Sequence, residues 1–183
     1  ARQRAAAAGV GDRIRVAIRD YRDLPAVPDP GFDAVVSVEM IEAVGAAYWP
    51  TYFATIDRVL APDGRAVVQA ITMPHRQMER IRGHETWINK YIFPGGLIPS
   101  VEAIGDACRA TRLRPREVRS FGAHYAATLR LWRERFVRRG AEVAALGFDP
   151  TFQRTWCLYL AVCEAGFTTG RLDVRHLLLR RSP

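Results

Sequence analysis

Two short acidic segments of this sequence have residue types suited to chemistry, and each follows a predicted strand. The first spans residues 19–23 (RDYRD) and the second spans residues 39–45 (EMIEAVG). Ligands of open parallel sheets bind in the crevice beyond the carboxyl ends of the strands. Asp20 can accept a hydrogen bond from an amino group such as that of adenine, and Tyr21 can pack against a flat ring. A carboxylate of the second segment is expected at the mouth of this crevice.

Turn formation is the alternative interpretation of the first segment. Asp20 and Asp23 belong to the residue types that cap turns by accepting hydrogen bonds from nearby backbone N–H groups. Residue type alone leaves both interpretations open. No metal site is predicted, because the four histidines lack the spacing of metal ligands. They are His75, His84, His124 and His176.

The elements that position the two acidic segments alternate between helix and strand. Residues 1–9 are predicted to form the end of a helix, and the period-two pattern at 13–18 (RIRVAI) predicts a strand. The β-branched runs at 32–38 (FDAVVSV) and 64–71 (GRAVVQAI) are typical of strands covered on both faces. A predicted helix at 49–60 separates these runs. The resulting β-α-β unit requires parallel strands.

The second half of the chain is predicted to be mainly helical. Residues 74–99 form a polar and then aromatic excursion from the sheet, and a helix capped by Ser100 runs to about residue 111. Two amphipathic helices and two short strands complete the prediction, at 125–139, 152–167, 116–121 and 172–179. No repeat or linker divides the 183 residues, so a single domain, 1–183, is expected.

Composition excludes several classes of protein. Hydrophobic residues make up 49% and charged residues 25% of the chain, which is typical of a globular protein and excludes a disordered one. No apolar stretch approaches the roughly 18 residues that a membrane span needs. The three cysteines form no C-x-x-C pair, which argues against a zinc ribbon or a disulfide framework and fits a reducing cytoplasm.

The net charge of +8 comes almost entirely from arginine, since Lys90 is the single lysine. Such a charge suits either a solvated surface or contact with the phosphates of lipid head groups or nucleic acid. No nucleic-acid recognition motif accompanies it, so nucleic-acid binding is not expected. The arginines of the second half are Arg109, Arg112, Arg114, Arg116, Arg119, Arg130, Arg133, Arg135, Arg138 and Arg139.

Five longer segments carry a family resemblance that covers nearly the whole chain. They are VVSVEMIEAVGAAYWPTYF, GRAVVQAIT, WINKYIFPGGLIPSVEAI, FGAHYAATLRLWRERF and YLAVCEAGF. Together they resemble the cyclopropane-fatty-acyl-phospholipid synthases and their mycolic-acid relatives, and NKYIFPGGLIPS at residues 89–100 is particularly specific to that family. The resemblance implies an α/β fold, the Rossmann-like sheet of class I S-adenosylmethionine-dependent methyltransferases, with helical insertions that form an acyl pocket.

The resemblance also implies an activity. Such enzymes transfer a methyl group from S-adenosylmethionine (SAM) to the cis double bond of a phospholipid acyl chain, and a carbocation then closes to a cyclopropane ring. This implies SAM as cofactor, a membrane phospholipid as partner, and a cytoplasmic enzyme that lies peripherally at the inner face of the membrane. Loss of a different proton would give a methyl-branched lipid instead, and a lipid-binding fragment without a cofactor site is a third possibility.

Site residues follow from the same resemblance. The residues expected to bind the cofactor are Asp20, Tyr21, Arg22 and Glu39. Four catalytic candidates are expected around a bound bicarbonate that acts as the base: Glu42, Gln69, Ile71 through its backbone, and Tyr125. Cys163 is the fifth candidate, because it matches a cysteine often designated the active-site residue of the family. Many family members have His in place of Gln69, and an amide makes the anion site less positive. Cys163 is interpreted as a buried structural residue, because its neighbours form an apolar helix face.

Aromatic side chains are expected to keep the acyl pocket dry and to stabilise a carbocation through their ring faces. The candidates, for which an ordinary core role is the alternative, are Trp87, Tyr91, Phe93, Tyr125 and Trp132.

Two features of the implied fold are missing from the sequence. It contains no G-x-G-x-G turn, and its first residues resemble the helix that follows the second strand of the sheet. We therefore expect a sheet truncated by its first two strands, in which strand 13–18 is orphaned or repositioned and strand 32–38 has an exposed edge. Such a chain is expected to be poorly stable or to self-associate, with a homodimer as one form.

Overall fold

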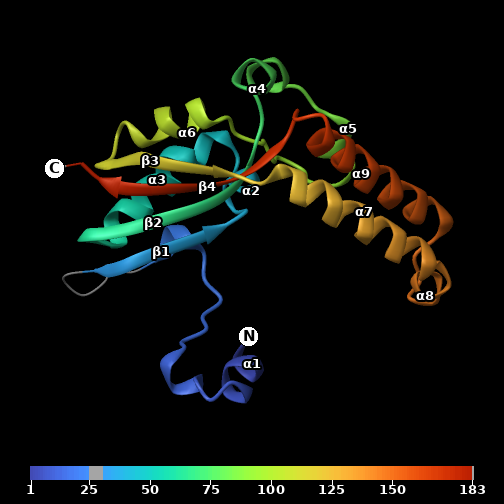
Figure 1. Ribbon diagram of the computed structural model, residues 1–183, viewed down its shortest axis with the longest axis horizontal. Coiled ribbons are helices and arrows are strands. Elements are labelled where there is room, and N and C mark those ends of the chain that lie inside the picture. Colours follow the sequence, from blue (N-terminus) through green and yellow to red (C-terminus); the bar gives the residue numbers. More distant parts are fainter. Residues whose placement is uncertain (25–30, 183) are drawn as a thin grey trace.

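The structure is a computed structural model that describes residues 1–24 and 31–182. Its strands form one mixed sheet in the order β1-β2-β4-β3 (Figure 1). Strands β1 and β2 are parallel, and β4 runs antiparallel to both β2 and β3. The predicted parallel β-α-β unit is therefore confirmed. The strands are β1 Phe32–Val38, β2 Leu60–Thr72, β3 Leu113–Ser120 and β4 Asp173–Arg181.

The helices fall into three groups, which Figure 1 separates clearly. Helix α1 lies below the sheet. Helices α2, α3 and α6 lie along the sheet, and the excursion between β2 and α6 carries α4 above it and α5 beside α9. Helices α7 to α9 form an arm that extends away from the sheet. The α-helices are α1 Arg2–Ala7, α2 Ile41–Val44, α3 Trp49–Val59, α4 His75–Ile81, α5 Trp87–Tyr91, α6 Val101–Cys108, α7 Gly122–Arg138, α8 Gly140–Ala145 and α9 Pro150–Thr168. The short 3-10 turns are η1 Gly11–Arg13, η2 Tyr21–Asp23 and η3 Ala46–Tyr48.

Local sequence explains where several of these helices begin. The Ser100 hydroxyl accepts a hydrogen bond of 3.0 Å from the backbone N–H of Ala103, which confirms the predicted cap of α6. Pro50 lies in the first turn of α3, where the N–H that proline lacks is not needed. The Trp49 indole N–H donates to the carbonyl of Ile41 at 3.0 Å, and this bond ties α3 to α2.

Two hydrophobic cores hold the chain together. In the larger one, Val68 of β2 packs among buried side chains of α3 and α6, such as Phe53 and Ile104. The smaller core joins the arm to β4, since Leu129 of α7 and Leu160 of α9 pack with Val174. The second core is what attaches the arm to the sheet.

The predicted strand at residues 13–18 is wrong. The segment begins in η1 and continues as extended chain, and it pairs with no strand of the described chain. Apolar alternation alone does not make a strand, because a strand also needs a neighbour to which its backbone can hydrogen-bond. Ile18 is consequently fully exposed. The expectation that this segment is orphaned is confirmed.

The expected exposed edge is also confirmed. Strand β1 is the last strand on its side of the sheet, so one row of its backbone groups has no strand partner in the described chain. Apolar side chains of β1 are exposed as well, and Val36 and Val38 are 70% and 56% accessible. An apolar strand at an open edge is a template for pairing with another chain.

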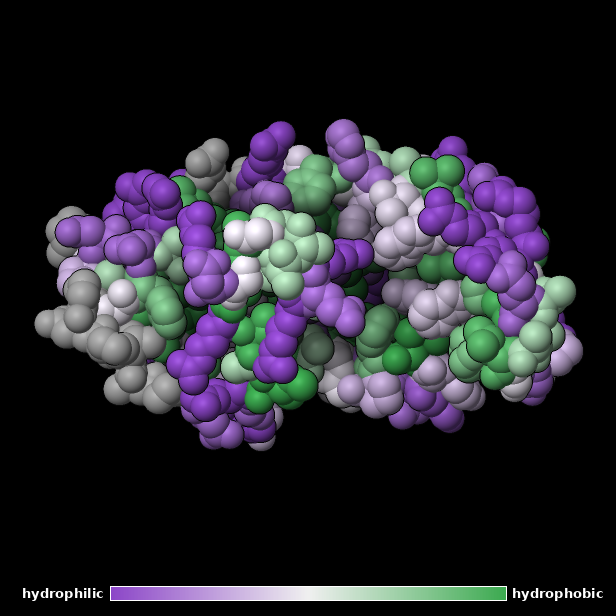
Figure 2. Space-filling model, turned by 90° about the horizontal axis from the view of Figure 1, so that it is seen from below, coloured by the Kyte–Doolittle hydropathy of each residue, from purple (hydrophilic) through white to green (hydrophobic). Residues whose placement is uncertain are grey.

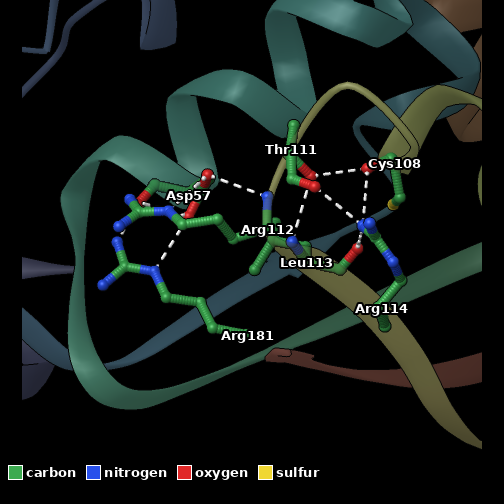
Figure 3. A network of polar contacts seen from close by, with 7 residues as sticks. All are labelled: Asp57, Cys108, Thr111, Arg112, Leu113, Arg114 and Arg181. Atoms are coloured by element: carbon green, nitrogen blue, oxygen red, sulfur yellow. Dashed lines mark hydrogen bonds and ion pairs between the residues drawn. The ribbon is translucent and has the colours of Figure 1, made fainter. Parts of the chain in front are cut away.

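A polar network lies at the end of the sheet where β3 begins and β4 ends (Figure 3). Asp57 of α3 is 9% exposed, and its carboxylate accepts hydrogen bonds from Arg112 at 3.2 Å and from Arg181 at 2.8 Å. Arg114 donates to the carbonyls of Thr111 and Leu113, both at 2.7 Å. The network thus joins α3, the start of β3 and the end of β4.

These contacts show that several arginines of the second half are engaged by acidic side chains of the protein. Arg112 is engaged by Asp57, and Arg130 and Arg133 by Glu164. The first half of the arginine set lies before and along β3, and the second half lies on α7 and at its C-cap, in the arm. Two separate groups result, because β3 and α7 leave their shared junction in different directions.

We predict that Asp57→Asn destabilises the fold by about 3 kcal/mol, since it leaves two arginines at the site without their carboxylate. Burial opposes ionisation of Asp57, but hydrogen bonds from Arg181 and Arg112 outweigh it and lower its pKa below the ordinary 3.8. The stabilisation is therefore complete at neutral pH and declines as pH falls through that lowered pKa. Urea unfolding at pH 7 and at pH 3 measures both effects.

Asp106→Asn is the matched control, because the Asp106–Arg109 pair is exposed and contributes about 1 kcal/mol or less. Equal stability of Asp57→Asn and wild type at pH 7 would contradict the structural role of the network.

We also predict that the chain self-associates through the β1 edge. Val36→Lys introduces a charge on the exposed face of that strand and is expected to increase the monomer fraction. Sedimentation velocity across a concentration series measures this fraction. Val137→Lys, at a 62% exposed position on α7, is the control that leaves self-association unchanged.

Candidate active site

The turn after β1 places a strained glutamate at the carboxyl end of the sheet. Glu39 has φ of 51°, the only positive value for a non-glycine residue in the described ranges. Its backbone N–H donates to the carbonyl of Gln69 on β2 at 2.9 Å. Its carboxylate accepts from Gln69 Nε2 at 2.9 Å and from the Tyr125 hydroxyl at 3.1 Å. Backbone strain of this kind persists where surrounding contacts fix it, and such positions gather at functional sites.

Glu42 lies one turn further on, in the first turn of α2. Its Oε1 accepts a short hydrogen bond of 2.5 Å from the backbone N–H of Ile71, whereas Oε2 is buried without a hydrogen-bond partner among the described residues. Burial raises the pKa of Glu42 to about 7; the hydrogen bond from Ile71 lowers it, and the charge of Glu39 raises it further. The site therefore contains a carboxyl group that titrates near neutral pH.

Tyr125 comes from the first turn of α7 and reaches the site from the arm. Burial first, and then the charge of Glu39, raise its pKa to about 12, so the phenol keeps its proton and acts as a donor. The ring lies 4.9 Å from that of Phe167 and 6.4 Å from that of Trp132. The start of α7 thus connects the smaller core to the two glutamates.

Cys163 lies in the smaller core and is 9% exposed. Burial raises the pKa of its thiol above the ordinary 9.0. A thiol in an apolar setting is a poor nucleophile. The prediction that Cys163 is buried among apolar side chains is confirmed.

His176 was not predicted as a site residue, yet it contacts one. It lies on β4 directly opposite Gln69, and its Nε2 is 2.9 Å from Gln69 Oε1. The Phe121 ring meets the imidazole edge-on at 4.7 Å. Only the antiparallel register of β2 and β4 brings these residues together, and their separation of 107 positions in the sequence gives no signal of it.

The candidate cofactor residues divide into two places. Asp20 caps η2, where its Oδ1 accepts from the Arg22 N–H at 2.9 Å and its Oδ2 pairs with the Arg22 guanidinium at 2.7 Å. These bonds lower the pKa of Asp20 to about 2. Tyr21 packs edge-on against Tyr52 of α3 at 5.8 Å. Glu39 instead joins the catalytic candidates, so the turn interpretation of Asp20 describes the geometry that is present.

The predicted pocket aromatics also lie in different places. Trp132 contacts Tyr125, and Phe93 contacts Tyr159 of α9 at 5.9 Å. The rings of Trp87 and Tyr91 lie 5.9 Å apart in a tilted arrangement within α5, and Tyr91 is 59% exposed.

An aromatic groove of about 520 Å³ lies in the arm, between α7, α8 and α9. Its walls include Trp132, Phe136, Trp156 and Leu160, with Arg139 at its border. In Figure 2, hydrophobic and hydrophilic side chains lie side by side along this end of the molecule.

The arrangement does not fit a bound bicarbonate. The groups expected to donate to the anion donate to protein carboxylates instead: Ile71 to Glu42, and Gln69 and Tyr125 to Glu39. No ion pair of the described chain brings a cation to either glutamate. A third anion beside two carboxylates would be repelled.

Among the described residues, no group of three or more His, Cys, Asp or Glu is placed to hold a metal ion. No helix in those ranges is both long and apolar enough to cross a membrane.

A family model, mycolic acid cyclopropane synthetase, matches residues 1–177. The chain belongs to this family. Tuberculostearic acid methyltransferase UfaA1 of Mycobacterium tuberculosis (strain ATCC 25618 / H37Rv) is 54% identical over 185 residues, covering 100% of this chain and 42% of that protein. The cyclopropane-fatty-acyl-phospholipid synthase of Escherichia coli (strain K12) is 33% identical over 168 residues. The match covers 92% of this chain and 41% of that protein.

A solved structure, mycolic acid cyclopropane synthase CmaA1 complexed with SAH and CTAB, is similar with a TM-score of 0.74 at 25% identity. The match covers 88% of this chain and 58% of that one. The family and the class I methyltransferase fold expected from the sequence are confirmed. The chain spans less than half the length of the two curated relatives.

We predict that Glu42→Gln stabilises the fold above pH 7. The pKa of about 7 lies above the ordinary 4.5, so the folded chain binds the proton more tightly than the unfolded chain. Stability therefore falls as pH rises between these values, and the variant avoids a loss on the order of 2 kcal/mol. Urea unfolding at pH 4, 6 and 8 measures the difference between variant and wild type.

The exposed Glu134→Gln is the control and is expected to show no such trend. A difference between Glu42→Gln and wild type that is the same at all three pH values would contradict the titration of Glu42.

Proposed function

We propose that this chain is the lipid-binding and catalytic part of a SAM-dependent methyltransferase that methylates the double bond of a lipid acyl chain. The observation that carries the proposal is the unpartnered, buried Oε2 of Glu42 at the carboxyl end of the parallel strands. Such a position is where α/β sheets bind ligands, and family membership supplies the reaction class. Because the chain spans less than half of its curated relatives, the activity is proposed for the complete protein.

SAM, when bound, supplies an electrophilic methyl group on a sulfonium sulfur. The adenine ring is proposed to lie by Asp20 and Tyr21, with Arg22 beside it. Asp20 has room for this role, because its carboxylate accepts three hydrogen bonds from Arg22 and a carboxylate offers about four acceptor positions. The ring of Tyr21 presents a flat surface close to α3.

Glu42 is proposed to remove the proton that completes the reaction. After the alkene has formed its bond to the methyl carbon, the acyl chain carries a carbocation and must lose a proton. Oε2 of Glu42 has a free acceptor position, and the Ile71 N–H holds Oε1 in place. A pKa near 7 leaves a large fraction of Glu42 ionised at neutral pH and lets the proton pass on to water. Since the site does not fit bicarbonate, the base is a protein carboxylate.

The product is proposed to be methyl-branched rather than a cyclopropane. Identity to the tuberculostearic acid methyltransferase is 54%, against 33% to the cyclopropane synthase. Gln69, where many family members have His, also distinguishes this site. Both products start from the same cation. Loss of a proton from the new methyl group with ring closure gives the cyclopropane, whereas a 1,2-hydride shift followed by loss of a methyl proton gives the isomeric methylene branch.

The arm is proposed to bind the lipid at the membrane surface. Its groove offers aromatic walls for an acyl chain, and Arg135 lines it as a partner for an anionic head group, whereas Arg139 is paired with Glu142. The location is then cytoplasmic and peripheral at the inner face of the membrane.

We predict that Glu42→Gln in the complete protein lowers methyl transfer at least a hundredfold, because an amide cannot accept the proton. SAM binding, measured by calorimetric titration, is expected to change less than threefold. Transfer is measured with radiolabelled SAM and phospholipid vesicles that contain a cis-unsaturated acyl chain. The two candidate products are isomers, so proton NMR distinguishes them by olefinic methylene signals or upfield cyclopropane signals.

Glu134→Gln on the exposed face of α7 again serves as the control with normal turnover. Unchanged turnover of Glu42→Gln would overturn the role of Glu42. Binding of vesicles without any SAM affinity would favour the lipid-binding module.

A further inference from the structure

The side-chain amide of Gln69 lies between Glu39, which accepts a hydrogen bond from it, and His176, which contacts its carbonyl oxygen. Its Nε2 is 2.9 Å from Glu39 Oε1, and its Oε1 is 2.9 Å from His176 Nε2. An ionised carboxylate only accepts hydrogen bonds, so the NH₂ end of the amide must face Glu39. The carbonyl end then faces His176, which requires His176 to carry its proton on Nε2.

This donor–acceptor order matters because the opposite orientation of Gln69 is repulsive. A flipped amide would place its carbonyl oxygen against the carboxylate of Glu39 and remove one of that group's two side-chain donors. Nothing in Gln69 itself prefers either orientation, since the amide is symmetric in shape. The carboxylate of Glu39 supplies the preference, and His176 with its proton on Nε2 reinforces it by donating to the carbonyl end of the amide.

The same contact supports the turn that carries both glutamates. Gln69 makes two hydrogen bonds with Glu39. Its side-chain NH₂ donates to the Glu39 carboxylate, and its backbone carbonyl accepts from the Glu39 N–H at 2.9 Å. Glu42 follows only three residues later, and its Oε1 is fixed by Ile71 on the same strand as Gln69. The orientation of Gln69 therefore acts on the position of Glu42 through a strained turn.

We propose that His176 is a positioning residue for the methyl-transfer reaction, which donates from Nε2 to Gln69 and so locks the NH₂ group of that amide onto Glu39. The inference rests on the function proposed above. It assigns to this chain a histidine that acts from the neighbouring strand β4, at a site where the residue on β2 is glutamine.

The test compares two substitutions in the complete protein. His176→Leu removes the donor, and His176→Gln keeps an N–H donor at this position. We expect His176→Leu to lower kcat about tenfold to a hundredfold, the effect of losing a hydrogen bond that controls a charged group. KM for the lipid and the SAM affinity are expected to change less than threefold, and His176→Gln is expected to restore kcat to within about threefold of wild type.

Nuclear magnetic resonance of the Gln69 side chain measures the state of the amide directly. In protein labelled with ¹⁵N at the glutamine side chains, the Gln69 NH₂ signals are assigned by their loss in Gln69→Ala. We expect these signals to shift and to exchange faster with solvent in His176→Leu, and to stay close to wild type in His176→Gln. In the Gln69→Ala background, His176→Leu is expected to cost no more than about twofold in kcat.

His84→Leu is the matched control, because His84 is exposed and lies outside the site. Equal kcat for His176→Leu and wild type would overturn the proposal, as would an equal loss in His176→Gln. If Gln69 signals respond but kcat does not, His176 orients the amide without supporting the reaction, and the positioning role is overturned while methyl transfer stands. If wild type itself transfers no methyl group, the proposed function fails and the positioning role falls with it.

Discussion

The close placement of two carboxylates without a cation is the constraint on which the site depends. Glu39 and Glu42 lie three residues apart, and no ion pair within the described residues reaches either one. Their negative charge is instead stabilised by directed donors from separate elements: the Ile71 N–H and the Gln69 amide of β2, and the Tyr125 hydroxyl of α7. Directed donors act only at short range and in fixed geometry. The sheet and the arm must therefore meet accurately at this point.

At the end of the sheet where β3 begins and β4 ends, a carboxylate is stabilised by arginines. There a single carboxylate, Asp57, is neutralised by two arginines and links three elements. Full ion pairing stabilises the folded chain but leaves no carboxyl group able to titrate near neutral pH. At the crevice, burial of Glu42 and the nearby charge of Glu39 raise its pKa to about 7, and no arginine offsets them. Stability and chemistry are thus placed at different ends of the same strands.

Sequence patterns predicted the elements well where the pattern is local. The parallel unit of β1, α3 and β2 followed from two β-branched runs around one amphipathic helix, and the cap at Ser100 followed from residue type. Patterns failed where a partner decides the outcome. Residues 13–18 alternate as a strand does, yet they have no neighbouring strand with which to pair.

The candidate site was predicted in part, and mostly through family resemblance. That comparison brought Glu42, Gln69 and Tyr125 together across the sequence, and the structure places them within one network with Glu39. It did not predict that Glu39 takes the donors expected for an anion, because that depends on a turn with positive φ. His176 could not be predicted, because the register between β2 and β4 pairs residues that are far apart in the sequence and no local pattern indicates it.

Helix α7 links the two parts of the proposed lipid site through its own periodicity. Tyr125, Trp132 and Arg139 are spaced by seven residues, which places them along one side of the helix. Tyr125 donates to Glu39, Trp132 lines the groove, and Arg139 borders it. At 1.5 Å per residue, the backbone positions of Tyr125 and Arg139 are about 21 Å apart along the axis. One helix therefore fixes the separation between the aromatic groove and the tyrosine that donates to Glu39.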